Sequence, residues 1–281
     1  LSHATHWVIP NKPIDIETNE EARQEYKRAR TDAENAKKKY ERSMHVKTTA
    51  TLAVAAKFKD REKFFLPWSF DYRGRAYPIP SYLTPHDTDF GKSLLRSSKT
   101  SKMNSDAVEW LEFQVATTYG LDKKSMTERL QWSRDNHSLI TAVATDPIGN
   151  LSEWETADEP WQFLAACEEF YHCVIIEDRL YTGLFVAVDA TCSGLQILAG
   201  LARDKGTAAL VNVLPSSEPQ DAYRSVLEAM EDIPPRLTEW MDRGVTKRSV
   251  MTIPYNATLQ SSRDYIRDAL RKNMPKDASG K

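Results

Sequence analysis

The sequence predicts an α+β fold that is predominantly helical, and three observations support this prediction. Residues 19–59 contain neither glycine nor proline and are rich in Ala, Glu, Lys and Arg, which indicates one long helix or a helical pair. Apolar residues recur at helical spacing over 104–119, and Gly120 follows as a helix stop. The continuous apolar run at 183–188 is typical of a strand covered on both faces.

Local composition predicts the remaining elements. Helices are expected at 125–145, 160–171, 193–203 and 220–230. Between Pro67 and Pro85, aromatic residues are interleaved with proline and glycine, which predicts irregular extended backbone held by ring packing. No apolar run is long enough to span a membrane, and the three cysteines form no even framework. We therefore expect an intracellular protein without a membrane segment.

Charge is unevenly distributed, although the net charge is only -2. Residues 23–47 and 242–281 each hold nine Lys or Arg against four Asp or Glu, whereas 151–179 holds eight acidic residues and one basic residue. A phosphate-binding face can therefore coexist with a nearly neutral total. Taken alone, each basic run is more often a solvated helix face.

A carboxylate follows the predicted strand directly. Asp189 precedes a short Ala-Thr-Cys-Ser-Gly segment and a predicted helix, so a rigid strand would hold it at an exposed sheet edge. Carboxylate oxygens are natural Mg²⁺ ligands, and nucleotidyl transfer commonly uses two such ions to orient the attacking hydroxyl and neutralise charge. Asp189 is therefore a candidate metal ligand. The alternative is that it only caps the following helix.

A basic helix is expected near the end of the chain. Arg243 and Lys247 are four residues apart, so on a helix they lie within about 40° of each other and can bind one triphosphate together. Tyr255 lies further along, where it can meet the sugar and base of that nucleotide. Pro254 is expected to kink or end the helix. The alternative for these basic residues is solvated surface.

The aromatic, proline-rich stretch contains a third candidate site. Gly74 permits close backbone approach, and the guanidinium groups of Arg73 and Arg75 suit a nucleic-acid backbone. The same residues are equally compatible with a structural turn closed by an ion pair from Asp71. Local sequence leaves both interpretations open.

Three segments resemble, in the same order, motifs of the single-subunit RNA polymerases of phages and mitochondria. They are D-Y-R-G-R-A-Y at 71–77, V-D-A-T-C-S-G-L-Q at 188–196 and R-G-V-T-K-R-S-V-M-T-I-P-Y at 243–255, similar to the D-x-x-G-R motif, motif A and motif B of that family. The connecting segments at 88–95, 159–167 and 202–216 are similar as well. The resemblance covers residues 64–255, with a looser helical match before them.

The resemblance implies part of a right-hand polymerase, namely the palm and the start of the fingers. Residues 1–62 would be a helical thumb-side segment. Residues 63–215 would be the palm, with a helical insertion at about 100–180, and 216–281 would begin the fingers.

The resemblance also implies roles for single residues. Asp189 would bind Mg²⁺, of which two ions are expected in the complete active site, with the carbonyl of Ala190 as a second contact. Arg243 and Lys247 would bind the nucleotide's phosphates, and Tyr255 would help to select ribose. The catalytic set would be Asp189, Lys247 and Tyr255. Contacts to the template, the hybrid or the RNA end would come from Arg73, Gly74, Arg75, Lys92 and Arg248.

The implied function is template-dependent transfer of nucleotides from ribonucleoside triphosphates to an RNA 3′ end, with a DNA template and the RNA transcript as partners. A phage enzyme would act in the host cytoplasm, and a eukaryotic one in the mitochondrial matrix or another organelle. Two alternatives remain, a non-catalytic or split-gene nucleic-acid-binding subunit and a family A-like DNA polymerase. The segment at 71–77 and the run at 189–194 disfavour the DNA polymerase.

The sequence departs from the family pattern near motif B and beyond it. Asn256 stands where the family has glycine, and asparagine tolerates left-handed backbone, so the turn there can survive. Pro254 replaces a small helix former, which puts template positioning in question. The family's second catalytic aspartate, in a downstream H-D-S segment, is not in this sequence, and Asp87 is no substitute because it precedes motif A. We expect the chain alone not to polymerise RNA efficiently. Either the sequence is truncated, which the start at Leu1 favours, or a second polypeptide carries the rest of the palm.

Overall fold

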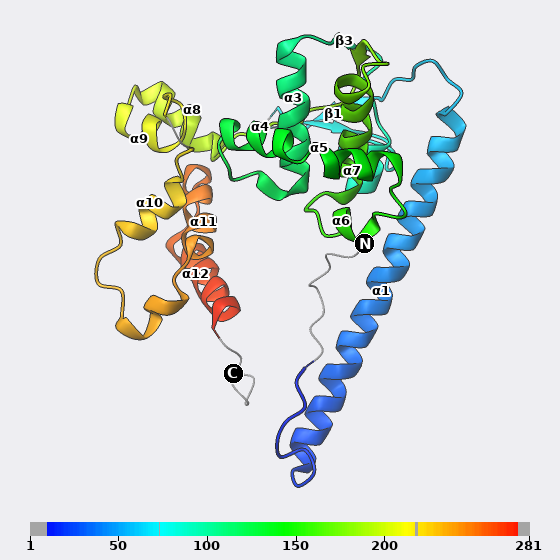
Figure 1. Cartoon of the computed structure of the whole chain (residues 1–281). Helices are drawn as coiled ribbons and strands as arrows, with labels where there is room; N and C mark the ends of the chain where they lie inside the picture. The colour runs from blue at the N-terminus through cyan, green and yellow to red at the C-terminus, as the bar shows by residue number, and fades with distance from the viewer. Residues whose placement is uncertain (1–9, 73, 217–218, 275–281) are drawn as a thin grey trace. The chain divides into compact units, whose positions relative to one another are not determined.

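The structure is a computed structural model that describes residues 10–72, 74–216 and 219–274 (Figure 1). Its contacts divide the chain into two compact units, Leu1–Ala187 and Val188–Lys281. Within the described ranges the fold is mainly helical with four short strands, which confirms the predicted α+β class. No helix in these ranges has an apolar stretch long enough to cross a bilayer. The thumb, palm and fingers boundaries remain predictions, and the division at residue 187 falls inside the expected palm.

The first unit begins with one long helix, α1, Glu20–Phe58, as the composition predicts (blue in Figure 1). The side chain of Asn19 caps the start of this helix, where its Oδ1 accepts the amides of Glu21 and Ala22 at 3.1 and 3.2 Å. Most of the helix is exposed, and Thr51 is its buried residue. The buried Thr51 therefore marks one place where the helix is anchored to the rest of the unit.

A buried carboxylate forms that anchor. Asp87 Oδ2 accepts the hydroxyl of Thr51 at 3.1 Å and the amide of Leu83 at 2.9 Å. Its Oδ1 accepts the amide of Thr88 at 2.7 Å and lies 3.1 Å from Lys47 Nζ. Burial alone would raise the pKa of Asp87, but these hydrogen bonds and the lysine lower it overall. Asp87 is thus occupied with holding the fold together, which agrees with its exclusion as a second catalytic aspartate.

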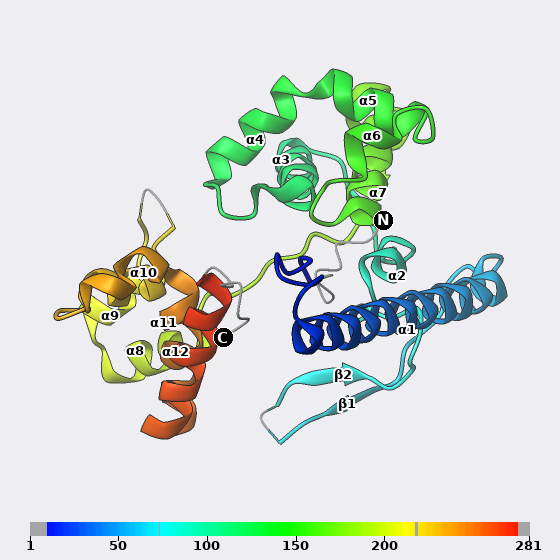
Figure 2. The same ribbon diagram turned by 90° about the horizontal axis from the view of Figure 1, so that it is seen from below.

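Residues 68–78 form an antiparallel hairpin in place of the predicted irregular backbone (Figure 2). Strand β1, Trp68–Phe70, pairs with β2, Ala76–Pro78. Gly74 in the connecting turn has a φ of 79°, a left-handed conformation that glycine adopts without strain. Pro78 is tolerated in β2 because it is the last residue of a strand in a two-stranded ribbon.

The body of the first unit is a group of packed helices with two small strands. The helices are α2 Asp89–Ser93, α3 Ser105–Ala116, α4 Met126–Asp135, α5 His137–Thr145, α6 Leu151–Trp154 and α7 Pro160–Phe170. Strand β3, Ser101–Lys102, pairs with β4, Tyr181–Thr182. The core is built from side chains that are at most 1% exposed, among them Leu111, Val115, Ile140, Phe163 and Phe170.

These helices confirm most of the predicted ones. Helix α3 ends in a π-turn in which Gly120 has a φ of 133°, so the glycine does mark the stop. The stretch expected to be helical at 125–145 is interrupted at Asn136, whose ψ of 25° leaves the helical range, and it forms α4 and α5. Ser125 and Glu128 start α4 with a reciprocal capping box.

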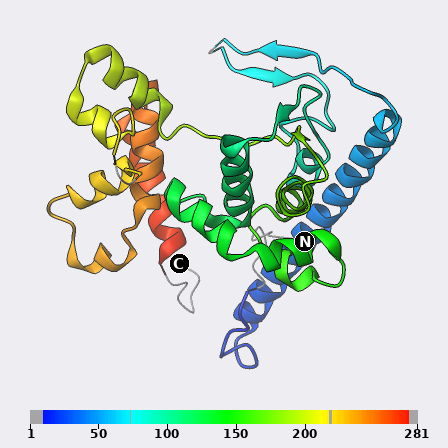
Figure 3. The same cartoon turned by 45° about the horizontal axis from the view of Figure 1, so that its top comes forward.

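The predicted strand at 183–188 is wrong. In this region the strand is β4, Tyr181–Thr182, which ends before the predicted segment. The described residues that follow run as an extended trace that pairs with no strand (Figure 3). Phe185 is 51% exposed and Val188 is 74% exposed. The amide of Ala187 bonds instead to the side-chain oxygen of Gln114 at 3.2 Å. The Gly183 carbonyl still accepts the amide of Ser97 at 2.8 Å, but a buried strand needs neighbours along both edges, and no described strand pairs with residues 184–188.

The second unit consists of short helices, drawn yellow to red in Figure 1. They are α8 Ser193–Ala202, α9 Lys205–Leu210, α10 Ala222–Glu228, α11 Arg243–Thr252 and α12 Leu259–Asn273, with 3₁₀ turns at Pro235–Trp240 and Ile253–Tyr255. Its buried cluster is small and consists of Ala199, Ala208, Val211 and Ala222. Aspartate side chains cap three of the helices, Asp204 for α9, Asp221 for α10 and Asp242 for α11.

Candidate active site

The carboxylate proposed as a metal ligand lies on the exposed segment before α8. Asp189 and Ala190 are both exposed. The residue that precedes α8 is Cys192, in a left-handed conformation with a φ of 47°, and no side chain caps this helix. The interpretation of Asp189 as a helix cap is therefore wrong, and its carboxylate faces solvent.

The predicted basic helix is α11. Its amino-terminal turn is fixed by Asp242, whose side chain accepts the amide of Val245 at 3.1 Å. Val245 and Thr246 are buried, whereas Lys247 is exposed. The structure thus places Arg243 and Lys247 on one helix, four residues apart, as predicted.

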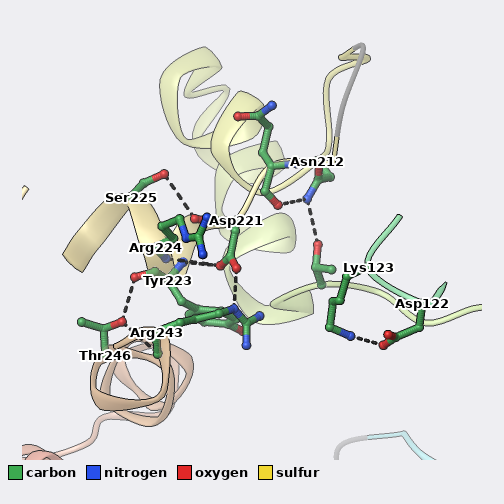
Figure 4. Close-up of polar contacts among 11 residues, drawn as sticks. Asp122, Lys123, Asn212, Asp221, Tyr223, Arg224, Ser225, Arg243 and Thr246 are labelled. Atoms are coloured by element: carbon green, nitrogen blue, oxygen red, sulfur yellow. Dashed lines mark hydrogen bonds and ion pairs between the residues drawn. The ribbon is translucent and has the colours of Figure 1, made fainter. Parts of the chain in front are cut away.

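Arg243 is held by two side chains of the segment that begins α10. Its Nε donates to Asp221 Oδ2, and its guanidinium carbon lies 4.9 Å from the centre of the Tyr223 ring (Figure 4). Asp221 is one-third exposed and Arg243 slightly more, so the pair lies at the surface of the unit. Burial alone would raise the pKa of Asp221, but the hydrogen bond from Arg243 and those from backbone amides lower it overall.

Tyr223 joins motif A to motif B. It is 5% exposed, and the Cys192 side chain is close enough to its phenol to affect the pKa. Its carbonyl oxygen accepts the hydroxyl of Thr246 from α11 at 2.7 Å (Figure 4). Burial and the neighbouring Cys192 raise the pKa of Tyr223 to about 12, so the phenol stays protonated at neutral pH.

The end of motif B lies against the beginning of α8. Helix α11 ends at Thr252, and Pro254 lies in the 3₁₀ turn that follows, as expected for a residue that cannot continue a helix. A Cβ built on Gly194 would lie 3.3 Å from Pro254 Cβ and 3.4 Å from the hydroxyl of Tyr255. Asn256 has a φ of 60° and a ψ of 38°, so the predicted left-handed turn is confirmed.

Arg248 also lies on α11, but it faces the following helix. Its guanidinium carbon is 4.0 Å from the centre of the Tyr265 ring of α12. Its expected contact with nucleic acid remains a prediction.

The remaining predicted contacts lie in the first unit. Arg73 lies outside the described residues. Asp71 accepts the amide of Arg75 at 3.0 Å and the hydroxyl of Tyr77 at 3.3 Å, so the hairpin turn is stabilised as a structural turn. The side chain of Arg75 is exposed, which leaves it available for a nucleic-acid backbone. The two interpretations of this segment are therefore compatible.

Lys92 is half-buried on α2. This helix is fixed to α7, because Asp89 accepts the amides of Trp161 and Gln162 at 2.7 and 3.1 Å. Burial raises the pKa of Glu159, and the nearby ammonium group of Lys92 partly opposes that shift. The position of Lys92 is therefore well defined, and its role at the RNA end remains a prediction.

The oxygen atoms of the Asp189 carboxylate and the Ala190 carbonyl are of the type that binds magnesium. A carboxylate and a carbonyl oxygen are the ligands that Mg²⁺ prefers, and this ion commonly keeps waters and substrate phosphates as further ligands. Among the described residues, however, no three His, Cys, Asp or Glu side chains are grouped closely enough to surround a metal. Asp189 and Ala190 therefore fit one side of a magnesium site.

Comparison with known proteins decides the family. A family profile described as DNA-dependent RNA polymerase matches residues 101–280. The chain belongs to the DNA-dependent RNA polymerase family. The mitochondrial DNA-directed RNA polymerase of Neurospora crassa is 31% identical over 80% of this chain, and that of Mus musculus is 34% identical over 74%. The T7 RNA polymerase of Escherichia phage T7 is 32% identical over 80% of this chain.

These relatives are single-subunit RNA polymerases of mitochondria and phages, which confirms the resemblance found in the motifs. The match favours an RNA polymerase over the DNA polymerase alternative. The chain spans 17%, 18% and 25% of the length of these three relatives. The profile match includes motifs A and B and begins after the hairpin and Lys92.

Three residues of the candidate site make contacts that the sequence did not predict. Asp221 and Tyr223 contact Arg243, and Asn212 donates to Thr191 Oγ1 at 3.1 Å and to the Gln220 carbonyl at 2.8 Å. Asp221 had a signal, since it is the second residue of the helix predicted at 220–230, and an aspartate near a helix start is a typical capping residue. The contact of Tyr223 with two motifs distant in sequence had none.

Proposed function

We propose that this chain is part of a DNA-directed RNA polymerase and contributes motif A and motif B to the binding of the incoming ribonucleoside triphosphate. The observation that supports this most directly is the contact between the start of α8 and Tyr255, 3.4 Å from a Cβ built on Gly194. Because Asp189 precedes α8 closely and Tyr255 ends motif B, this contact brings the two motifs together within one unit.

Arg243 and Lys247 would bind the phosphates. A guanidinium presents a planar fork of donors to phosphate oxygens, and an ammonium adds a compact positive charge one helical turn away. Tyr255 is 54% exposed, so its side chain is accessible to the sugar of the same nucleotide. These three side chains together suit a triphosphate with a ribose.

Asp189 and the carbonyl of Ala190 would hold Mg²⁺, of which two ions are expected in the complete site. When bound, the metal would lower the pKa of the RNA 3′-hydroxyl and neutralise charge on the α-phosphate. The 3′-oxygen would then bond to the α-phosphorus as pyrophosphate leaves, with the β- and γ-phosphates held by Arg243 and Lys247.

The template, the hybrid and the RNA end would contact the first unit through Arg73, Gly74, Arg75 and Lys92, and Arg248 would add a contact from α11. Phe70 and Tyr72 on the hairpin are 72% and 96% exposed, and such rings can stack on bases. The single carboxylate of the metal site favours a requirement for the remaining palm, supplied by downstream sequence or by a second polypeptide. The setting would be mitochondrial or that of a phage-infected host.

Extension of a primed DNA template would test this function. The chain would be assayed alone and joined to the polypeptide encoded downstream of it, with ribonucleotides and Mg²⁺. We expect extension only by the joined protein and its loss in the Asp189→Asn variant, because the amide is a poor magnesium ligand. Tyr255→Phe should keep extension and lower the preference for ribonucleotides over deoxyribonucleotides.

Glu228→Ala serves as the control, since this exposed acid lies on α10 in the same unit. Equal extension by wild type and Asp189→Asn would contradict the metal role. Efficient extension by the chain alone would contradict the need for further palm residues.

A further inference from the structure

The carboxylate of Asp221 has a separate partner on each oxygen. Its Oδ1 accepts the amides of Tyr223 and Arg224 at 3.0 and 3.3 Å, which caps α10. Its Oδ2 accepts the Nε proton of Arg243 (Figure 4). The backbone bonds fix the carboxylate in place, so the arginine is held by a rigid acceptor and not by a freely rotating side chain.

The guanidinium of Arg243 is fixed in two directions. The hydrogen bond from Nε to Asp221 fixes the guanidinium along one edge. Its central carbon also lies over the Tyr223 ring, 4.9 Å from the ring centre. Among the described residues no hydrogen bond uses its two Nη groups, which are the donors that form a fork toward phosphate. The arrangement thus occupies one edge of the arginine and leaves the other free.

The residues that hold Arg243 are themselves fixed to both motifs. Tyr223 has the Cys192 side chain as a neighbour, and its carbonyl oxygen accepts the hydroxyl of Thr246. Asn212 joins the same segment to motif A, because it donates to Thr191 and exchanges hydrogen bonds with the backbone of Gln220. The orientation of Arg243 is therefore tied to the turn that carries Asp189.

We infer that Asp221 is a positioning residue for the reaction: it orients the guanidinium of Arg243 so that the Nη fork meets the triphosphate of the incoming nucleotide. This inference rests on the proposed function, because it assumes that Arg243 binds phosphate. Asp221 does not itself touch the nucleotide in this role. A flexible arginine must lose side-chain freedom when it binds, and Asp221 removes that cost beforehand.

The competing role for Asp221 is that of a counter-ion that occupies Arg243 and must be displaced by phosphate. The two roles predict opposite changes in anion affinity when the carboxylate is removed. Removal of a positioning carboxylate weakens anion binding, whereas removal of a competing carboxylate strengthens it, because one negative charge near the phosphate is lost.

Binding of inorganic tripolyphosphate and of Mg-ATP to the chain, measured by calorimetry at fixed ionic strength, separates these roles. We expect Asp221→Ala to weaken binding about tenfold or more, as loss of orientation commonly does. Asp221→Asn has a single acceptor oxygen, which can keep the α10 cap but then turns its amide NH₂ group toward the Nε donor. This variant should therefore keep the helix and weaken binding as Asp221→Ala does. In an Arg243→Ala background, Asp221→Ala should have no further effect, because Asp221 acts through Arg243.

Asp204→Ala is the matched control. Asp204 caps α9 through the amides of Gly206 and Thr207, as Asp221 caps α10, and its described contacts do not include an arginine. It should bind tripolyphosphate as the wild type does. Thermal unfolding of each variant would confirm that the fold is kept, and Asp221→Asn provides the test if Asp221→Ala does not fold.

In the joined polymerase, Asp221→Ala should raise the KM for all four ribonucleotides similarly and lower kcat less. Arg243-dependent binding that is unchanged or tighter in both Asp221 variants would overturn this inference and leave the proposed function intact. No binding by the wild type, or binding insensitive to Arg243→Ala, would overturn the phosphate role of Arg243 and this inference with it.

Discussion

The hydroxyl of Thr246 donates to the carbonyl oxygen of Tyr223 over 2.7 Å, and this bond joins α11 to α10. Thr246 is 5% exposed, so water does not readily replace a lost bond. Thr246→Val keeps the shape of the side chain and removes the donor, and we expect it to lower the free energy of unfolding by about 1–3 kcal/mol. Urea denaturation followed by circular dichroism would measure the change. Thr252→Val is the control, because that hydroxyl bonds within its own helix to the Arg248 carbonyl at 2.9 Å. Equal losses in both variants would contradict the importance of this contact.

Two glycines of α8 should respond differently to alanine. A Cβ on Gly200 would meet no atom within 4 Å, so Gly200→Ala should stabilise the unit by roughly 0.5–1 kcal/mol through helix propensity. At Gly194 the same Cβ would crowd Pro254 and the Tyr255 hydroxyl, and Gly194→Ala should lose that gain. Melting temperatures of the two variants, measured side by side, would check this. The close packing of α8 on Tyr255 would be refuted if Gly194→Ala stabilised as much as Gly200→Ala.

Asp87 should make the stability of the first unit depend on acid pH. Because the pKa of Asp87 is lower in the folded chain than its ordinary value of 3.8, the ionised carboxylate stabilises the fold above that value. This stabilisation is lost as the pH falls through the folded pKa. Asp87→Asn should therefore cost about 1–3 kcal/mol at pH 7 and flatten the acid part of the stability profile. Asp60→Asn, at an exposed acid after α1, should leave the profile unchanged. An unaltered acid profile in Asp87→Asn would show that its carboxylate does not contribute.

The three cysteines should react with iodoacetamide at different rates. Burial raises the pKa of Cys167 well above its ordinary value of 9.0, and it also raises the pKa of Cys173, although Arg179 and Arg96 oppose that shift. Both thiols are at most 5% exposed, whereas Cys192 is half-buried. At pH 8 we expect Cys192 to be alkylated first, as read by mass spectrometry of peptides. In the denatured chain, the three cysteines should be alkylated at similar rates. Rapid labelling of Cys167 in the native chain would contradict the burial described for α7.

The local patterns of the sequence predicted local structure well. The long helix α1 and the stop at Gly120 follow from backbone preferences that act within a few residues. The left-handed turn at Asn256 was predicted from the family's glycine at that position together with the tolerance of asparagine for this backbone. The strand at 183–188 failed because a strand requires a partner elsewhere in the chain, and hydrophobicity alone does not reveal one. The break at Asn136 likewise lies inside a stretch with helical composition.

In the candidate site, too, local features could be predicted from the sequence, whereas contacts between distant segments could not. On the expected helix, the four-residue spacing of Arg243 and Lys247 predicted that both lie on one face, because four residues make about one turn. The contact of Tyr223 with Cys192 and with Arg243 joins residues that are 31 and 20 positions from it, and no local pattern encodes it. The role proposed for Asp221 depends on the bond that its second carboxylate oxygen accepts from another helix, and no local pattern in the sequence encodes that bond.

Asn256, with a φ of 60°, has an evolutionary consequence. Glycine and asparagine both adopt this backbone at little cost, so descendants of this sequence can exchange one for the other and still direct the chain into α12. A valine or isoleucine substitution would strain the same corner and would be removed by selection, however well it suited the neighbouring side chains.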